Sequence, residues 1–172
     1  MVATEPNNFY FCDVIAMRLL GIDVGGRRIG LAISDVSATL ARPWRTVVRT
    51  GSAKKLVIKL AIQIRQLEQG DDGLERIIVG LPKHLDGRPH DQATLVLAFA
   101  EMLRDVTRVP ITFQDERLTS HEAESRLADS EPDWRKRKLR LDAAAAAVIL
   151  QDYLDQRLVT EARDLEIGPD LV

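Results

Sequence analysis

Three acidic residues stand where a folded chain could use them to bind a divalent cation. Asp23 ends the apolar run 19–22, Glu116 lies in the segment ITFQDER (residues 111–117), and Asp142 comes directly before five alanines. A carboxylate held in an apolar strand must be compensated by a positive charge or by hydrogen bonds. Hard cations such as Mg²⁺ bind through a few carboxylates together with water and phosphate oxygens, so the three acids suit phosphodiester hydrolysis.

Each of these acids also has a purely structural explanation. Asp23 could be neutralised by an arginine of the turn that follows it, and Asp142 could be only the N-cap of the alanine-rich helix. In ITFQDER, strand alternation points Asp115 and Glu116 to opposite faces, so only one of them can face a shared site. The residues alone leave open which of the two is the ligand.

Other nucleotide and metal chemistries find less support. The chain has no GxxxxGK[ST] motif, and GGRRIG (residues 25–30) lacks the glycine spacing of a dinucleotide fingerprint. The three histidines, His84, His90 and His121, and the single Cys12 form neither a zinc set nor a Cys/His pair. A P-loop, a Rossmann site and a zinc centre are therefore disfavoured.

The charges of the chain are balanced in total but clustered along the sequence. There are 24 Lys and Arg against 26 Asp and Glu, a net charge of −2. Residues 23–55 hold seven basic residues and two acids, 134–141 hold five basic residues and no acid, and 155–172 hold five acids and two basic residues. Clustered basic residues are typical of proteins that bind phosphates, although they can also form an ordinary solvated surface.

The elements that must position these residues follow from periodicity and turn chemistry. Strands are expected at 18–24, 28–33, 46–48, 76–79 and 111–114, and helices at 52–69, 91–107, 119–128 and 142–156, with an irregular basic loop over 129–140. The order predicts an α/β fold, with a mixed sheet covered by helices on both faces.

The chain reads as one folded domain. We expect an N-terminal extension over residues 1–17, the domain over 18–157 and a flexible C-terminal tail over 158–172. Cys12 as the single cysteine excludes an internal disulfide, and the chain shows neither a signal peptide nor a run apolar enough for a membrane helix. A cytoplasmic protein is the expectation.

Four segments together resemble the signature blocks of one family. They are LGIDVGGRRIGLAISD (20–35), IIVGLPKHLDG (77–87), QDERLTSHEAE (114–124) and LDAAAAAVILQDYL (141–154). In order and spacing they resemble the YqgF family, also called RuvX, of RNase H-like nucleases. The resemblance implies an RNase H-like fold, a five-stranded mixed sheet with the second strand antiparallel. It also implies a metal-dependent endonuclease that hydrolyses phosphodiester bonds, in 5′-end processing of pre-16S rRNA during ribosome biogenesis.

The resemblance also assigns roles to individual residues. Asp23, Glu116 and Asp142 become the catalytic residues and the ligands of two Mg²⁺ (or Mn²⁺) ions, bound with the help of the substrate phosphate. One position departs from the family, because His84 stands where the middle block usually has Asn. The expected nucleic-acid contacts are the basic residues near these acids: Arg27, Arg28, Arg117, Arg135, Lys136, Arg137, Lys138 and Arg140.

Two other functions remain compatible with the same fold. One is a Holliday junction resolvase acting on branched DNA, since RNA and DNA present the same phosphates. The other is a non-catalytic RNA-binding factor in ribosome assembly. Sugar kinases and actin-like ATPases share the Asp-x-Gly hairpin but clasp ATP between two such domains, for which 172 residues are too few. Expected partners are nucleic acid and ribosomal particles, with the chain a monomer or homodimer.

Overall fold

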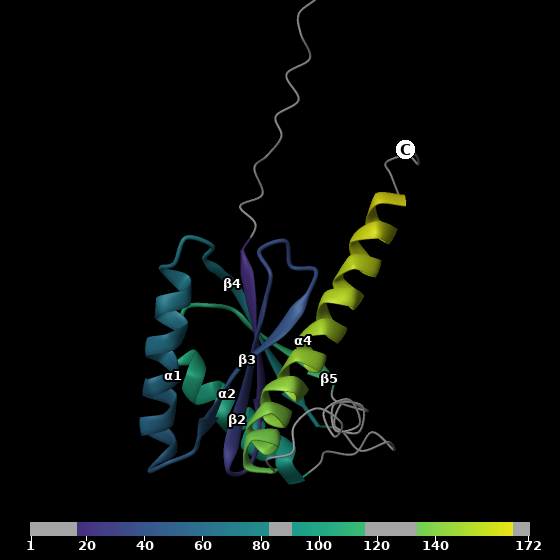
Figure 1. Ribbon diagram of the computed structural model, residues 1–172. Helices are drawn as coiled ribbons and strands as arrows, with labels where there is room; N and C mark the ends of the chain where they lie inside the picture. The colour runs from purple at the N-terminus through teal and green to yellow at the C-terminus, as the bar shows by residue number, and fades with distance from the viewer. Residues whose placement is uncertain (1–16, 83–90, 116–133, 167–172) are drawn as a thin grey trace, which may run out of the picture.

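The computed structural model describes residues 17–82, 91–115 and 134–166 (Figure 1). The predicted helix over 119–128 lies outside these residues. So do Glu116, Arg117 and all three histidines.

A five-stranded mixed sheet forms the centre of the molecule. Its strands run in the order β3-β2-β1-β4-β5. β2 is antiparallel to both β1 and β3, whereas β1, β4 and β5 are parallel to one another. This arrangement confirms the predicted α/β class with an antiparallel second strand, and it is the topology of the RNase H-like fold. The strands are β1 (Arg18–Val24), β2 (Arg28–Ser34), β3 (Ala41–Val48), β4 (Leu74–Leu81) and β5 (Ile111–Asp115).

Helices cover both faces of the sheet. α1 (Ala53–Glu68) and α2 (Asp91–Arg104) lie on one face, and α4 (Trp134–Glu166) crosses the other (Figure 1). Alternation along β1 sends Leu20 and Ile22 into the apolar cluster beneath α1 and α2, and Leu19 into the cluster beneath α4. No helix in the described part of the chain has the length and apolarity of a membrane span.

The α4 helix approaches the sheet more closely than ordinary side chains would allow. A Cβ atom built on Gly21 would lie 2.8 Å from the carbonyl oxygen of Ala146, and one built on Gly30 would lie 1.8 Å from the carbonyl oxygen of Asp142. Glycine is therefore required at both positions, since any side chain would push the helix away. Small side chains on the helix, such as Ala146, complete this contact.

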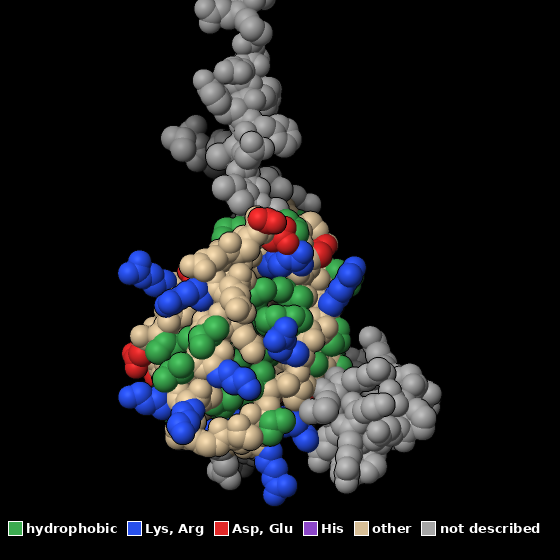
Figure 2. Space-filling model, turned by 60° about the vertical axis from the view of Figure 1, so that its left-hand side comes forward, with side chains coloured by type: hydrophobic (Ala, Val, Ile, Leu, Met, Phe, Trp, Pro, Cys, Tyr) green, Lys and Arg blue, Asp and Glu red, His purple; other side chains and the backbone are tan. Residues whose placement is uncertain are grey.

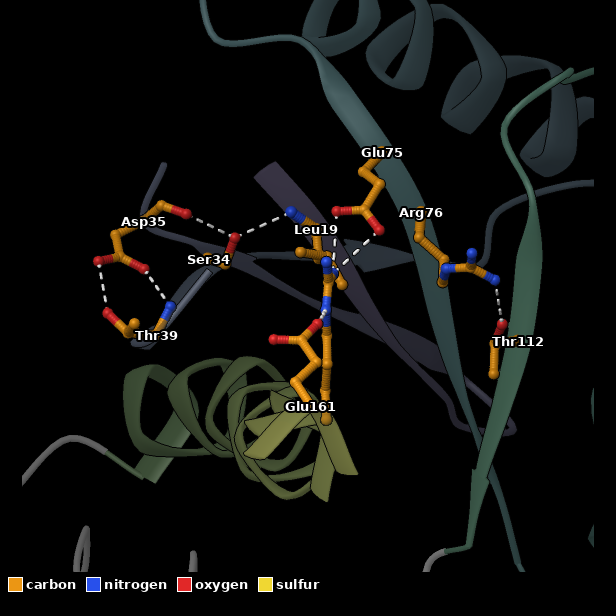
Figure 3. A network of polar contacts seen from close by, with 9 residues as sticks. Leu19, Ser34, Asp35, Thr39, Glu75, Arg76, Thr112 and Glu161 are labelled. Atoms are coloured by element: carbon orange, nitrogen blue, oxygen red, sulfur yellow. Dashed lines mark hydrogen bonds and ion pairs between the residues drawn. The ribbon is translucent and has the colours of Figure 1, made fainter. Parts of the chain in front are cut away.

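Polar contacts fix α4 along its length as well. The side chain of Gln151 accepts a hydrogen bond from the Ala41 backbone at 2.9 Å and donates one to the Thr39 carbonyl at 3.1 Å. Further along, the guanidinium of Arg157 donates to both carboxylate oxygens of Glu75 at 2.9 Å (Figure 3). The helix is thus tied to two separate strands.

The start of α4 corrects the prediction for this region. The expected irregular loop is wrong over residues 134–140, and so is an N-cap at Asp142, because the helix already begins at Trp134 and Asp142 lies in its interior; residues 129–133 lie outside the described part of the chain. The physical reason is that residues 135–141 contain only Arg, Lys and Leu, which are strong helix formers, and that Pro132 and Asp133 are typical of a helix start. The basic residues predicted on a loop are therefore carried by the first two turns of a helix.

The end of α4 and the strands β3 and β4 also extend beyond the predicted bounds, β4 covering Leu74–Leu81 instead of 76–79. α4 continues to Glu166, where a flexible tail from residue 158 was predicted. β3 begins at Ala41 instead of residue 46. The first half of this strand was not predicted, because Pro43 argues against a strand. Proline is tolerated there for two reasons: β3 is an edge strand, and its pairing with β2 shifts register between Leu31 and Ala32.

The close approach of α4 makes a direct prediction for stability. Gly30→Ala should lower the free energy of unfolding by at least about 3 kcal/mol, because its methyl group would overlap the Asp142 backbone. Gly26→Ala is the matched control, since no atom lies within 4 Å of a Cβ built there. Urea denaturation measures both variants. Equal stabilities for the two would contradict the helix placement.

Candidate active site

Asp23 lies near the end of the central strand β1, on the face covered by α4. Its backbone partner on β2 is Gly30, and residues paired directly across two strands share a face. The pKa of the Asp23 carboxyl is raised to about 6, first by burial and then by the negative charge of Asp142. A partly buried acid at the centre of the sheet therefore ionises with difficulty.

Asp142, which lies far from Asp23 in the sequence, is positioned by α4 beside the same strands. Its backbone rests directly on Gly30, the cross-strand partner of Asp23. Its carboxylate forms an ion pair with Arg28, in which Nε donates to Oδ2 at 2.5 Å. Both side chains of this pair are about three-quarters buried, with exposed fractions of 24% for Arg28 and 26% for Asp142.

The fold thus brings two of the three predicted acids together. Within the described residues there is no cluster of three or more metal-ligating side chains, and Glu116 lies outside them. Asp23 and Asp142 provide two carboxylates, with Arg28 beside them as a fixed positive charge. Carboxylate oxygens suit a hard divalent cation, and the guanidinium suits a phosphate.

The orientation of β5 shows which face of the sheet carries Asp115. Ile111 and Phe113 pack against the apolar cluster beneath α1 and α2, whereas Gln114, only 7% exposed, lies beside α4 in a cavity that it shares with Tyr153. By alternation, Asp115 at the end of the strand faces α1 and α2, away from Asp23.

Two residues that sequence reasoning missed hold the turn after Asp23. Arg49 donates from its guanidinium to the Gly25 carbonyl at 3.0 Å, and its backbone N–H donates to the Arg27 carbonyl at 3.0 Å. The side-chain amide of Gln92 donates to the Val24 carbonyl at 3.1 Å. No sequence motif marks these contacts, because each joins the turn to a separate element.

The predicted nucleic-acid contacts divide into three groups. Arg28 is paired with Asp142, and Arg27 is exposed in the turn beside it. Arg117 lies outside the described residues. The remaining five belong to the first two turns of α4: Arg135, Lys136, Arg137, Lys138 and Arg140. These turns come directly before Asp142 on the same helix.

Comparison with known proteins relates the chain to one family. The model of the RuvX family, described as "Holliday junction resolvase", matches residues 17–156. A "Putative pre-16S rRNA nuclease" of Caldanaerobacter subterraneus subsp. tengcongensis is 42% identical over 142 residues, which cover 82% of this chain and 98% of that relative. A protein of the same name from Anaeromyxobacter dehalogenans is 44% identical over 141 residues, covering 82% of this chain and 98% of its own.

Among solved structures, the chain is similar to the Thermus thermophilus RuvC structure. It is 18% identical with a TM-score of 0.47, and the match covers 84% of this chain and 98% of RuvC. Asp23 and Asp142 both lie within the residues that the family model matches.

The raised pKa of Asp23 predicts that Asp23→Asn stabilises the metal-free protein near neutral pH. The carboxyl ionises near pH 4 in the unfolded chain and near pH 6 in the folded one, so its ionisation opposes folding by at most about 3 kcal/mol above pH 6. The penalty is absent below about pH 4 and grows as the pH rises to about 6. Urea denaturation in EDTA should therefore give a mutant advantage near zero at pH 4 and about 1–3 kcal/mol at pH 7.

Asp35→Asn is a control with the opposite sign. Hydrogen bonds from the Ser37 hydroxyl, the Leu40 N–H and Thr39 hold the pKa of the Asp35 carboxyl well below its usual range. Figure 3 shows the contacts with Thr39. Its contribution to stability is therefore present above about pH 4 and is lost as the pH falls. Asp35→Asn should destabilise the protein at pH 7 and less so in acid. For the first variant, a change in unfolding free energy on Asp23→Asn that did not depend on pH would contradict the burial of the Asp23 carboxyl.

Proposed function

The chain belongs to the RuvX family, and we propose that it is a metal-dependent endonuclease that hydrolyses phosphodiester bonds at the 5′ end of pre-16S rRNA. The observation that carries this proposal is the meeting of Asp23 and Asp142, from opposite ends of the domain, beside Arg28. The family and the names of the relatives support the reaction class and the RNA substrate. A pre-rRNA substrate implies that the enzyme acts in the cytoplasm.

The chemistry of the two described acids fits a divalent cation. Burial and the charge of Asp142 make Asp23 costly to ionise, so a cation placed against both carboxylates would offset that cost. Arg28 contacts one oxygen of Asp142 and supplies only part of the compensation. Two Mg²⁺ or Mn²⁺ ions would supply an activated water and stabilisation of the leaving oxygen. Substrate phosphate oxygens would complete their coordination.

The side chains of the chain take distinct roles in this proposal. Asp23, Asp142 and Glu116 hold the cations, and Arg28 orients Asp142 while offering its other N–H groups to the substrate phosphate. Arg27, Arg117 and the basic first turns of α4 hold the nucleic-acid backbone on either side of the cleaved bond. The site would thus separate cation binding from strand binding.

A second candidate substrate is a four-way DNA junction. The family description names Holliday junction resolvases, and the phosphodiester chemistry would be the same. Because carboxylate-bound cations and a guanidinium would act on phosphates, which RNA and DNA share, the geometry suits either nucleic acid. Matched RNA and DNA substrates therefore decide between the two.

The proposal predicts that Asp23→Asn and Asp142→Asn each lower Mg²⁺-dependent cleavage by about a thousandfold, because each removes a carboxylate from the cation site. Asp105→Asn, at an exposed acid after α2, is the control and should retain the activity of the wild type. The assay compares a pre-16S 5′-end RNA with a four-way DNA junction under single-turnover conditions.

The same assay contains the results that would overturn the proposal. Near-normal turnover by Asp23→Asn would remove this residue from the mechanism. A wild type that binds the RNA but cleaves neither substrate would instead favour the non-catalytic assembly factor. Preferential cleavage of the junction would favour the resolvase.

The orientation of β5 predicts which neighbouring acid completes the site. Glu116→Gln should lower cleavage as strongly as Asp23→Asn, because Glu116 is the acid that the family resemblance assigns to the site and Asp115 faces away from Asp23. Asp115→Asn should leave cleavage within about threefold of the wild type, since Asp115 follows Ile111 and Phe113 on the opposite face. Rates at saturating Mg²⁺ measure both variants. The reverse ranking would show that the strand alternation breaks at this point.

A further inference from the structure

One long segment of the chain carries positive charge without any negative charge. Residues 36–67, which include β3 and most of α1, contain no Asp or Glu. The cations Arg42, Arg45, Lys54, Lys55 and Lys59 are exposed, and Arg49 is partly exposed. We call these six residues the basic face. Figure 2 brings this side forward and shows Lys and Arg side chains spread over it, with acidic side chains only near its margins.

The basic face begins at the end of the sheet that carries the candidate active site, and its β3 arginines lie on the face opposite to Asp142, because Arg45 pairs with Leu31 and Arg42 with Ile33. Arg28, which contacts Asp142, pairs with Val48 at the end of β3, and Arg49 then reaches back to the Gly25 carbonyl. From there β3, the edge strand of the described sheet, runs to Arg42. The span from Val48 to Arg42 is about 20 Å, which is the length of about six stacked nucleotides.

The edge strand β3 also presents a planar guanidinium group, that of Arg45. Trp44 lies where the pairing of β3 with β2 shifts register, and its ring packs partly against the core. The guanidinium of Arg45 lies over this ring, with its Cζ atom 4.1 Å from the ring centroid. Such a contact holds the guanidinium plane in one orientation, and the outer side of a guanidinium plane can stack on an unpaired base.

The charges of the basic face are not neutralised by the residues that the structure describes. Several arginines elsewhere form ion pairs, such as Arg18 with Asp72 and Arg157 with Glu75. Among residues 17–82, 91–115 and 134–166, no cation of the basic face takes part in an ion pair. Unneutralised cations in a row are complementary to a polyanion, and their positive potential attracts one.

We propose that the basic face binds a single-stranded segment of the nucleic acid that flanks the bond to be cleaved. Arg42, Arg49 and the lysines at the start of α1 contact its phosphates, and Arg45, held flat by Trp44, stacks on one of its bases. The inference rests on the proposed nuclease function and adds the path of the strand. It leads from Arg28 along β3.

A competing explanation is that the arginines only protect an edge strand. Charged side chains and proline on an edge prevent pairing with another sheet. Pro43 and the register shift already interrupt this edge, however, and the lysines of α1 lie off it. Edge protection therefore accounts for part of the basic face and not for its continuation onto α1.

The test compares two variants that lose the same charge. Arg42→Gln/Arg45→Gln/Lys55→Gln changes the basic face, and Arg104→Gln/Arg108→Gln/Arg163→Gln changes exposed cations on other elements. Fluorescence anisotropy measures the affinity for a labelled 14-nucleotide single-stranded RNA, and for DNA of the same sequence, across salt concentrations in EDTA. The log–log salt slope should fall by about 2 for the first variant, since each lost phosphate contact lowers it by about 0.7. The control should match the wild type.

Arg45→Lys separates stacking from charge. It keeps the positive charge but loses the planar group, so the salt slope should stay unchanged while the affinity for the single strand falls about fivefold or more. The affinity for a duplex of the same length should not change. An equal loss on the duplex would overturn the single-stranded assignment.

The outcomes distinguish this inference from the function on which it rests. If the wild type binds and cleaves but the two triple variants have equal salt slopes, the strand path is wrong and the nuclease function stands. Self-association of the basic-face variant with an unchanged slope would likewise assign the arginines to edge protection. If the wild type binds neither RNA nor DNA and cleaves neither substrate, the proposed function fails together with the inference.

Discussion

The contact between α4 and two glycines of the sheet determines most of what the site can do. Gly21 and Gly30 let the helix backbone rest directly on β1 and β2. This contact buries Asp23 beneath the helix, and it places Asp142 against the strand that pairs with β1. Without it, the two acids would belong to separate surfaces. The glycines therefore shape the candidate site although neither has a side chain to contribute.

Bringing the acids together opposes folding, and the surrounding structure limits that cost. The charge of Asp142 adds to burial in raising the pKa of Asp23, while Arg28 compensates Asp142. A hydrophobic core on each face of the sheet supplies the stability that the carboxylate pair removes. Functional sites commonly hold such unfavourable groups, because the ligand stabilises them when it binds. The same logic explains why a neutral residue at position 23 would favour folding and oppose function.

Local structure could be predicted well from the sequence, whereas the length of α4 could not. The β1–β2 hairpin and Asp23 were identified because apolar runs around a glycine turn are a local signal. Asp142 was predicted as a candidate ligand, but as a helix cap, since an acid before alanines is the usual sign of an N-terminus. The helix extends through the basic residues because their side chains favour it and nothing in residues 135–141 breaks it. Contacts such as Gln92 to Val24 join distant segments and leave no trace in composition.

The interior position of Asp142 has a consequence for how the site can respond to a ligand. A capping residue at the end of a flexible loop could move with its backbone, but Asp142 is held by helical hydrogen bonds on both sides. The helix is about 50 Å long and is anchored well beyond the site by Gln151 and by the pair of Arg157 with Glu75. Adjustment to a cation must therefore come from rotation of the Asp142 and Arg28 side chains. Because Arg28 contacts only one oxygen of Asp142, such a rotation would leave the second oxygen available to a cation while the ion pair persists.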